Sequence, residues 1–206
     1  MKVGLSHILQ MRSVIFEASV SLDGFIEGPN GELDWLVAEE EQTFDIDAFL
    51  SSFDTIFYSR KAYEKLGIPQ NIHGDLSLDE TELYYTLHGI RKYVFSRKQK
   101  HVAGNGMVIS ENLEGEVKRI RREEGKNIWL CGGADILRTF ADLDLVDEYV
   151  LRIHPVVLRS GKLLFTGNEM PLNLKLVDTQ ELRSGVVILH YKPKSRLKNQ
   201  YVSRSL

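Results

Sequence analysis

The chain has 206 residues with a formal net charge of -3; 43% of the residues are hydrophobic and 27% are charged. This length suits one domain with a full core, and the mild acidity gives no basis for nucleic acid or a membrane as partner. The single cysteine, Cys131, excludes an internal disulfide and fits a reducing compartment, so we expect a cytoplasmic protein.

The N-terminal part begins with a predicted flexible extension, residues 1–11, before the first clear strand. That strand is predicted for Val14–Ser21, which is apolar and rich in β-branched residues. A loop dense in turn residues follows at 22–31. Next comes a stripe at helical spacing, which predicts a helix facing the core, formed by Ile46, Phe49, Leu50 and Phe53.

The middle of the chain alternates between predicted strands and helices. Strands are predicted at 55–58, 92–95, 107–109 and 128–131. Helices are predicted at 59–66 and 78–89, and a further helix from the helical spacing of Leu113, Val117 and Ile120. A last helix is predicted after Gly133, where Ile136, Leu137 and Phe140 share one face.

The C-terminal part adds a strand at 149–153 and then an antiparallel hairpin of strands at 174–179 and 186–191. Residues 12–192 are predicted to form one α/β domain and the basic residues 193–206 a flexible tail. The alternation predicts a three-layer fold, with a mostly parallel central sheet, an antiparallel C-terminal hairpin and helices on both faces.

Three predicted strands end in residues suited to a phosphate. They are followed by Ser59–Lys61, by Ser96–Arg97 and by Gly132–Gly133. Ligands of such sheets bind at the carboxyl ends of the strands, and the N–H groups of a helix N-terminus stabilise a phosphate. Gly132–Gly133 alone could equally be a tight strand-to-helix turn without a ligand. Three such ends in one sheet favour a nucleotide site.

These residues resemble the dihydrofolate-reductase-like family, related to the reductase domain of bifunctional riboflavin-biosynthesis deaminase/reductase proteins. The resemblance spans roughly residues 13–192. The segments that carry it are Ala18–Ile26, Gly31–Leu36, Ser59–Glu64, Phe95–Arg97, Ile128–Ala134, Leu145–Glu148 and Pro155–Leu158 with Gly161.

The resemblance implies an NADPH-dependent reductase without a metal, acting on a small heterocyclic or conjugated substrate. It assigns the pyrophosphate to Gly132 and Gly133, together with Cys131 and the helical turn Ala134, Asp135 and Ile136. Further phosphate contacts fall on Ser59, Arg60 and Lys61, the adenosine 2′-phosphate on Ser96 and Arg97, and the nicotinamide carboxamide on backbone at Ser19 and Ile26. Ser59 stands where the family usually has glycine, and Ala62 where it has a hydroxyl residue.

The substrate side offers fewer candidates. Glu40 aligns with the family's proton-assisting carboxylate, although Glu39 and Glu41 fit as well and an exposed acidic helix start is the plainer interpretation. Asp23 is the other catalytic candidate, or else a turn-forming side chain. A substrate cleft is predicted between the loop 23–35, which includes Trp35, and the helix expected to bear Phe49 and Phe53.

Other chemistries find less support. The six histidines show no metal-ligand spacing. Cys131 could be a nucleophile near a helix N-terminus, but a small packing residue is the plainer interpretation. The alternative function is a non-catalytic NADP-binding sensor or partner-binding protein. Relatives often pair through edge strands, so the hairpin after Leu174 predicts a homodimer.

Overall fold

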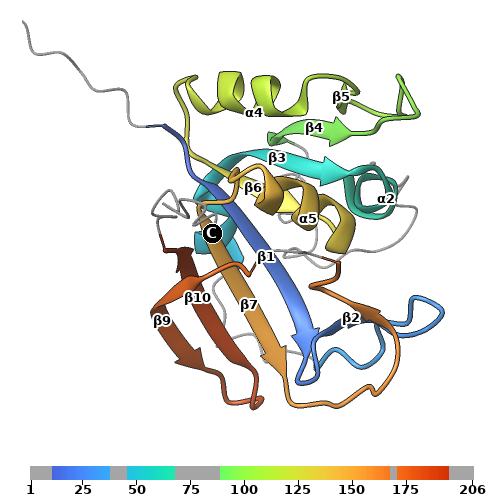
Figure 1. Cartoon of the computed structure of the whole chain (residues 1–206), viewed down its shortest axis with the longest axis vertical. Coiled ribbons are helices and arrows are strands. Elements are labelled where there is room, and N and C mark those ends of the chain that lie inside the picture. Colours follow the sequence, from blue (N-terminus) through green and yellow to red (C-terminus); the bar gives the residue numbers. More distant parts are fainter. Residues whose placement is uncertain (1–10, 38–45, 68–88, 168–170, 195–206) are drawn as a thin grey trace, which may run out of the picture.

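A mixed β-sheet forms the centre of this computed structural model, which describes residues 11–37, 46–67, 89–167 and 171–194 (Figure 1). Its strand order is β5-β4-β3-β6-β1-β7-β10-β9. The strands are β1 (Val14–Ser21), β3 (Phe53–Ser59), β4 (Arg91–Phe95), β5 (Met107–Ile109), β6 (Asn127–Cys131), β7 (Glu148–His154), β9 (Leu174–Glu181) and β10 (Val187–Pro193).

The sheet confirms the predicted mixture of parallel and antiparallel pairing. Every neighbouring pair from β5 to β7 is parallel, whereas β10 pairs antiparallel with both β7 and β9. β1 lies at the centre, with Val14 opposite Ile128 of β6 and Ile15 opposite Glu148 of β7. The carboxyl ends of these six parallel strands therefore reach the same edge of the sheet.

A second, two-stranded sheet was not predicted from the sequence. β2 (Phe25–Glu27) pairs antiparallel with β8 (Lys162–Leu163), and the Leu164 N–H donates to the Gly24 carbonyl at 3.0 Å. Gly161 precedes β8 at a φ of +140°, and a Cβ there would lie 2.1 Å from the Glu27 carbonyl oxygen. Only glycine allows these two loops to approach so closely.

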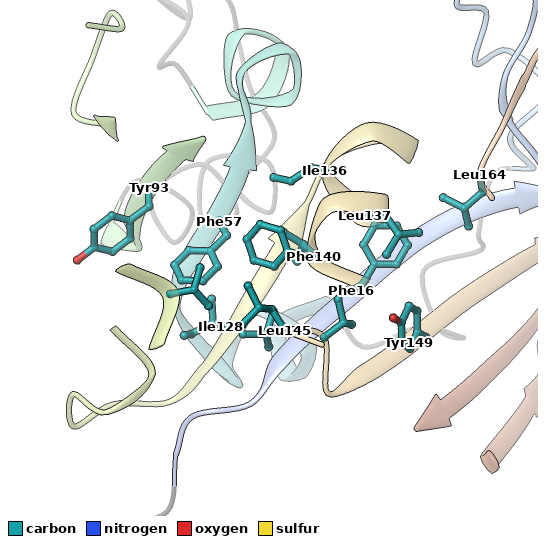
Figure 2. Packing of buried hydrophobic residues seen from close by; sticks show 14 of the residues in the cluster. Phe16, Phe57, Tyr93, Ile128, Ile136, Leu137, Phe140, Leu145, Tyr149 and Leu164 are labelled. Carbon is teal, nitrogen blue, oxygen red and sulfur yellow. The ribbon is translucent and has the colours of Figure 1, made fainter. Parts of the chain in front are cut away.

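Two helices, α4 (Leu113–Arg121) and α5 (Ala134–Asp142), cover one face of the sheet. The face of α5 predicted to be apolar is buried, and its Phe140 packs between Phe57 and Phe95 with ring centroids 6.0 and 5.1 Å away. Figure 2 shows this core beneath α5, where Phe16 and Tyr149 come from the adjacent strands. Large apolar side chains buried in this way supply most of the stability of such a domain.

The opposite face is covered in part by α1 (Ile46–Ser51), whose Phe49 lies edge-on against Trp129 of β6 with centroids 5.5 Å apart. Phe53 was assigned to this helix, and that assignment is wrong: the helix ends at Ser51 and Phe53 opens β3. The segment predicted as one helix at 59–66 is a short α2 (Arg60–Ala62) followed by a π-helical turn, η1 (Tyr63–Gly67).

A buried ionic clamp holds the amino-terminal edge of the sheet. The Arg12 side chain, 2% exposed, is paired with Asp54 and donates to Thr55 Oγ1 at 2.7 Å. Arg121 of α4 donates to the Arg12 carbonyl at 3.0 Å and pairs with Asp147 at 2.8 Å. The clamp joins the start of β1 to α4, to β3 and to the turn before β7.

Several predictions fall on residues that the structure does not describe. They include the extension before residue 11, most of the helix predicted at 78–89, and the tail beyond residue 194. The flexible character of both termini stays a prediction.

Candidate functional site: the carboxyl ends of the central strands

Three of the predicted phosphate-binding strand ends lie side by side. In the parallel register, Ser59 at the end of β3 is opposite Phe95 of β4, and Tyr58 is opposite Cys131 of β6. The next residues along β4 and β6 are Ser96 and Gly132. The structure thus brings the three candidate segments to one edge of the sheet.

Gly132 has almost no room for a side chain. A Cβ there would lie 2.7 Å from Ile136 Cγ2 and 2.8 Å from Ser59 Oγ. Both neighbours are held, because Ile136 is buried in the core and Ser59 Oγ accepts a hydrogen bond from the Ala62 N–H at 3.2 Å. Glycine at this position is therefore explained by the close packing of β3, β6 and α5.

Gly133 is different, because the atoms that would crowd a side chain there are the ends of two flexible side chains. It is the N-cap residue, and no side chain caps the helix. A Cβ there would lie 3.3 Å from both Ile26 Cδ1 and Lys162 Nζ, which are the mobile ends of two side chains. Uncapped N–H groups of the first helical turn attract anions.

Lys162 is a member of this site that sequence reasoning missed. Its Nζ comes close to Gly133, although β8 lies almost thirty residues further along the chain. In the part of the chain described here, no carboxylate forms an ion pair with Lys162. The position of Lys162 depends on the pairing of β2 with β8. In the sequence, the only local indication of that pairing is a lysine directly after a loop glycine. A lysine beside an uncapped helix N-terminus gives a strong preference for an anionic ligand.

The other predicted cofactor residues lie around this point with different degrees of exposure. Arg60 is half-exposed and pairs with Glu64 at 2.6 Å, a surface ion pair that a phosphate could replace at little cost. Lys61 and Arg97 are exposed, and Ser96 is buried with its Oγ accepting from the Gln99 N–H at 3.1 Å.

The first turn of α5 contributes backbone rather than side chains. Ala134 and Ile136 are buried, and Asp135 points to solvent with its side chain 84% exposed. Of the residues expected near a nicotinamide, Ile26 is buried next to Gly133, and Ser19 lies on β1 opposite Arg152.

Asp23 acts as a brace between two loops. Its carboxylate accepts hydrogen bonds from Ser21 Oγ at 2.7 Å and from the N–H groups of Leu158 and Arg159 at 3.1 and 2.8 Å. Desolvation would raise the pKa of Asp23, but these hydrogen bonds outweigh it and hold the pKa below its ordinary value. A carboxylate that is held ionised in this way cannot readily donate a proton. The structure therefore favours the turn-forming role of Asp23 over the role of a proton donor.

The predicted substrate side is described only in part. Trp35 donates to the Glu32 carbonyl at 3.0 Å, and its ring lies edge-on to His154 at 5.5 Å. Phe49 and Phe53 both pack on Trp129, at 5.5 and 6.2 Å. Glu40 lies outside the described residues, as do Glu39 and Glu41.

Cys131 is 6% exposed, and burial, followed by the nearby charge of Glu17, raises the pKa of its thiol. A neutral buried thiol is a poor nucleophile, so packing is its role here. Across the described ranges, no His, Cys, Asp or Glu side chains gather in a group of three suited to a metal. In the same ranges, no helix has the length and apolar character of a membrane span.

Comparison with known families decides the relationship. Residues 12–188 match the family described as the RibD C-terminal domain. The chain belongs to that family. It is also 43% identical over 189 residues to the uncharacterized protein YyaP of Bacillus subtilis (strain 168), covering 91% of this chain and 98% of that protein.

Solved structures agree with the RibD C-terminal domain assignment at the level of the fold. A putative riboflavin biosynthesis protein from Shewanella sp. PV-4 has a TM-score of 0.72 at 20% identity, covering 88% of this chain and 99% of the other. Dihydrofolate reductase from Enterococcus faecalis, solved in complex with NADP(H), has a TM-score of 0.60 at 12% identity, covering 88% and 96%. The predicted dihydrofolate-reductase-like fold is confirmed.

One departure from the family pattern has a structural explanation. Ser59, which replaces the usual glycine, uses its hydroxyl to cap the turn that begins at Arg60. Ala62 contributes its backbone N–H to that cap and is half-buried. The serine thus stabilises the turn and leaves the neighbouring cations, Arg60 and Lys61, on the surface.

Proposed function

We propose that this RibD C-terminal domain protein is an NADPH-dependent reductase that transfers hydride to a small heterocyclic or conjugated substrate. The observation that carries the proposal is the convergence of Gly133, the uncapped start of α5 and Lys162 at the carboxyl edge of the sheet. A glycine backbone, a helix start that no side chain caps and a cation in one place suit a pyrophosphate.

The residues around this point fit the rest of a dinucleotide. Gly133 and Lys162 would hold the pyrophosphate, and Arg60 and Lys61 would add positive charge beside it. Ser96 and Arg97, at the adjacent end of β4, would meet the adenosine 2′-phosphate. Ser19 and Ile26 would place the nicotinamide near the centre of the sheet.

The bound cofactor would supply the hydride, and the protein would supply orientation and a site from which water is excluded. The substrate would lie on the face of the sheet that carries Trp35 and Trp129, where aromatic rings offer a flat apolar surface.

Titration with NADPH and NADH, followed by the fluorescence of Trp35 and Trp129, tests the cofactor part. We expect Lys162→Met to weaken NADPH binding about tenfold, because a charge-assisted contact to phosphate is lost. Lys118→Met, at an exposed position of α4, is the matched control and should bind as the unaltered protein does. Equal affinity in the two variants would remove Lys162 from the site.

Oxidation of NADPH with dihydrofolate and with the ribosylamino-pyrimidine of the riboflavin pathway tests the catalytic part. Turnover with either compound supports the reductase. Tight NADPH binding with no acceptor reduced would instead support the non-catalytic NADP-binding alternative.

We also propose that the protein is a homodimer through β9. This edge strand is exposed along most of its length, and Leu176 and Val177 are 48% and 49% exposed on its two faces. An open edge with apolar side chains favours pairing with a second copy. Sedimentation should give twice the 23.6 kDa chain mass, and Val177→Asp should shift it to the monomer. A monomer before substitution contradicts the proposal.

A further inference from the structure

Tyr63 joins two of the segments that the proposed cofactor site uses. It is the first residue of η1, directly after α2, and it is fully buried. Its hydroxyl donates a hydrogen bond to the Ala103 carbonyl at 2.7 Å and accepts one from the Gly106 N–H at 2.8 Å. Both partners belong to the loop 96–106, which leads from the end of β4 to the start of β5. One hydroxyl therefore connects the turn after β3 with the loop after β4.

Packing fixes the position of this hydroxyl. A Cβ at Gly106 would lie 2.7 Å from Tyr63 Cζ, and a Cβ at Gly67 would overlap the same ring. The ring also lies edge-on to Tyr58 of β3, with the centroids 5.7 Å apart, in a buried cluster that includes Val94 of β4. Two glycines thus let the backbone touch the ring, and the hydroxyl is held where it meets the loop.

The loop 96–106 carries positive charge. Its exposed cations are Arg97, Lys98 and Lys100. In the described ranges, no carboxylate forms an ion pair with any of them. The loop begins at Ser96, whose Oγ accepts a hydrogen bond from the Gln99 N–H at 3.1 Å. Its second half is held by Tyr63, so the three cations lie between Ser96 and the residues that Tyr63 bonds.

The contacts of Tyr63 link β3 and β4 beyond the end of their pairing. The parallel ladder between these strands ends at Ser59 opposite Phe95. In the part of the chain that the structure describes, the hydrogen bonds between η1 and the loop both use the Tyr63 hydroxyl. Gly104, at a φ of +76°, and Gly106 give this loop many alternative conformations. Without the hydroxyl, the loop would have to be ordered when a ligand binds, at an entropic cost.

The ring and the hydroxyl of Tyr63 make separable contributions. Phenylalanine would fill the same buried space, because the ring contacts with Tyr58, Gly67 and Gly106 do not use the hydroxyl. If the hydroxyl served stability alone, its loss would weaken the binding of every cofactor equally or not at all. If it positions the cations of the loop, its loss would weaken only the binding of a cofactor that places a phosphate there.

We propose that Tyr63 is a positioning residue that sets the preference of this protein for NADPH over NADH. Its hydroxyl holds the loop 96–106 so that Arg97 and the neighbouring lysines meet the adenosine 2′-phosphate, which NADH lacks. The phosphate in turn stabilises the same loop conformation, because the coupling between two such equilibria is reciprocal. This inference rests on the proposed reductase function.

Calorimetric titration of the unaltered protein and of Tyr63→Phe tests the proposal. The unaltered protein should bind NADPH about tenfold or more tightly than NADH. Tyr63→Phe should weaken NADPH binding about five- to tenfold and NADH binding less than about twofold. Adenosine 2′,5′-bisphosphate and 5′-AMP, which differ only in the 2′-phosphate, should repeat this pattern. Tyr58→Phe is the matched control, because it removes a buried hydroxyl from the same cluster and leaves the loop contacts in place; it should keep the preference.

A double variant tests whether Tyr63 acts through the loop. Arg97→Met alone should lower the preference for NADPH, and adding Tyr63→Phe should then lower it by much less than Tyr63→Phe does alone. Circular dichroism establishes that each variant is folded. If Tyr63→Phe does not fold, hydrogen exchange of the unaltered protein decides. The Gly106 amide, bonded to the hydroxyl, should exchange about fivefold or more slowly with saturating NADPH than with saturating NADH.

The inference is overturned if folded Tyr63→Phe lowers the affinity for both cofactors by the same factor, or for neither. Full additivity in the double variant, or equal protection of the Gly106 amide by the two cofactors, also overturns it. So does an unaltered protein that binds NADPH and NADH equally well. Absence of binding to either cofactor is a separate result, which overturns the proposed reductase function itself.

Discussion

The two adjacent glycines should respond in opposite ways to the same substitution. In Gly132→Ala the new methyl group would lie 2.7–2.9 Å from Ile136 and Ser59, closer than carbon atoms pack. Ile136 is buried and Ser59 is hydrogen-bonded to the next turn, so the crowding cannot relax easily. Overpacking of this kind costs about 1–3 kcal/mol, which lowers Tm by about 2–12 °C in a domain of this size.

Gly133→Ala should leave the fold almost unchanged. Its φ of -91° and ψ of -164° are accessible to alanine, and the nearest atoms, 3.3 Å away, are the ends of the Ile26 and Lys162 side chains. Alanine leaves the unfolded chain fewer conformations than glycine does, which stabilises the folded state slightly and offsets the crowding. The free energy of unfolding should therefore change by no more than about 0.5 kcal/mol. The methyl group does occupy the space where a phosphate would approach, and NADPH affinity should fall about tenfold or more.

Thermal unfolding and NADPH titration of both variants separate these effects. The expected pattern is a destabilised Gly132→Ala and a stable Gly133→Ala with weak cofactor binding. A Gly133→Ala protein that binds NADPH normally would refute the phosphate site at this turn. A Gly132→Ala protein with an unchanged Tm would refute the packing explanation.

Three further predictions follow from contacts away from this turn. Asp54→Ala removes the ion-pair partner of the buried Arg12 and should lower the free energy of unfolding, measured in urea, by about 2–3 kcal/mol. Glu114→Ala breaks an exposed ion pair and should lower it by less than about 0.5 kcal/mol. Similar losses in the two variants would contradict a special role for the clamp. Because the pKa of Asp23 is lower in the folded protein, its ionised carboxylate stabilises the fold fully above the unfolded-state pKa, and this stabilisation is lost as the pH falls through the folded-state pKa. The Tm of Asp23→Asn should therefore lie below that of the unaltered protein at pH 7, and the difference should shrink in acid. A difference in Tm that does not change with pH would contradict this explanation. Cys131 should react with a thiol reagent only after unfolding, and fast labelling of the native protein would show that the thiol is accessible.

The local elements could be predicted because each carries its own periodic pattern. β6 and α5 were expected from Ile128–Cys131 and from the spacing of Ile136, Leu137 and Phe140, and both are present. The error at Phe53 has a clear cause, since its spacing from Phe49 and Leu50 suits a helix, yet its ring packs on Trp129 from the first residue of β3. Local spacing cannot distinguish these two ways of reaching the same apolar surface.

The parts of the site that were missed depend on contacts between distant segments. Lys162 reaches Gly133 only because β8 pairs with β2, and each of these strands is too short to carry a pattern. Tyr63 reaches the loop 96–106 because β3 and β4 are neighbours, which follows from topology rather than from either strand alone. Asp23 was left open between a catalytic group and a turn-forming side chain, and its hydrogen bonds to Leu158 and Arg159 required the folded chain.

The central position of β1 has a consequence for synthesis on the ribosome. Its first residues pair with Ile128 and Glu148, so both neighbours of this strand emerge more than a hundred residues after it. At a translation rate of about 5–20 residues per second, the apolar strand waits roughly 6–23 s for its first partner. The domain cannot complete its sheet from the N-terminus onward, and the nascent chain must be kept from aggregating until β6 and β7 have left the ribosome.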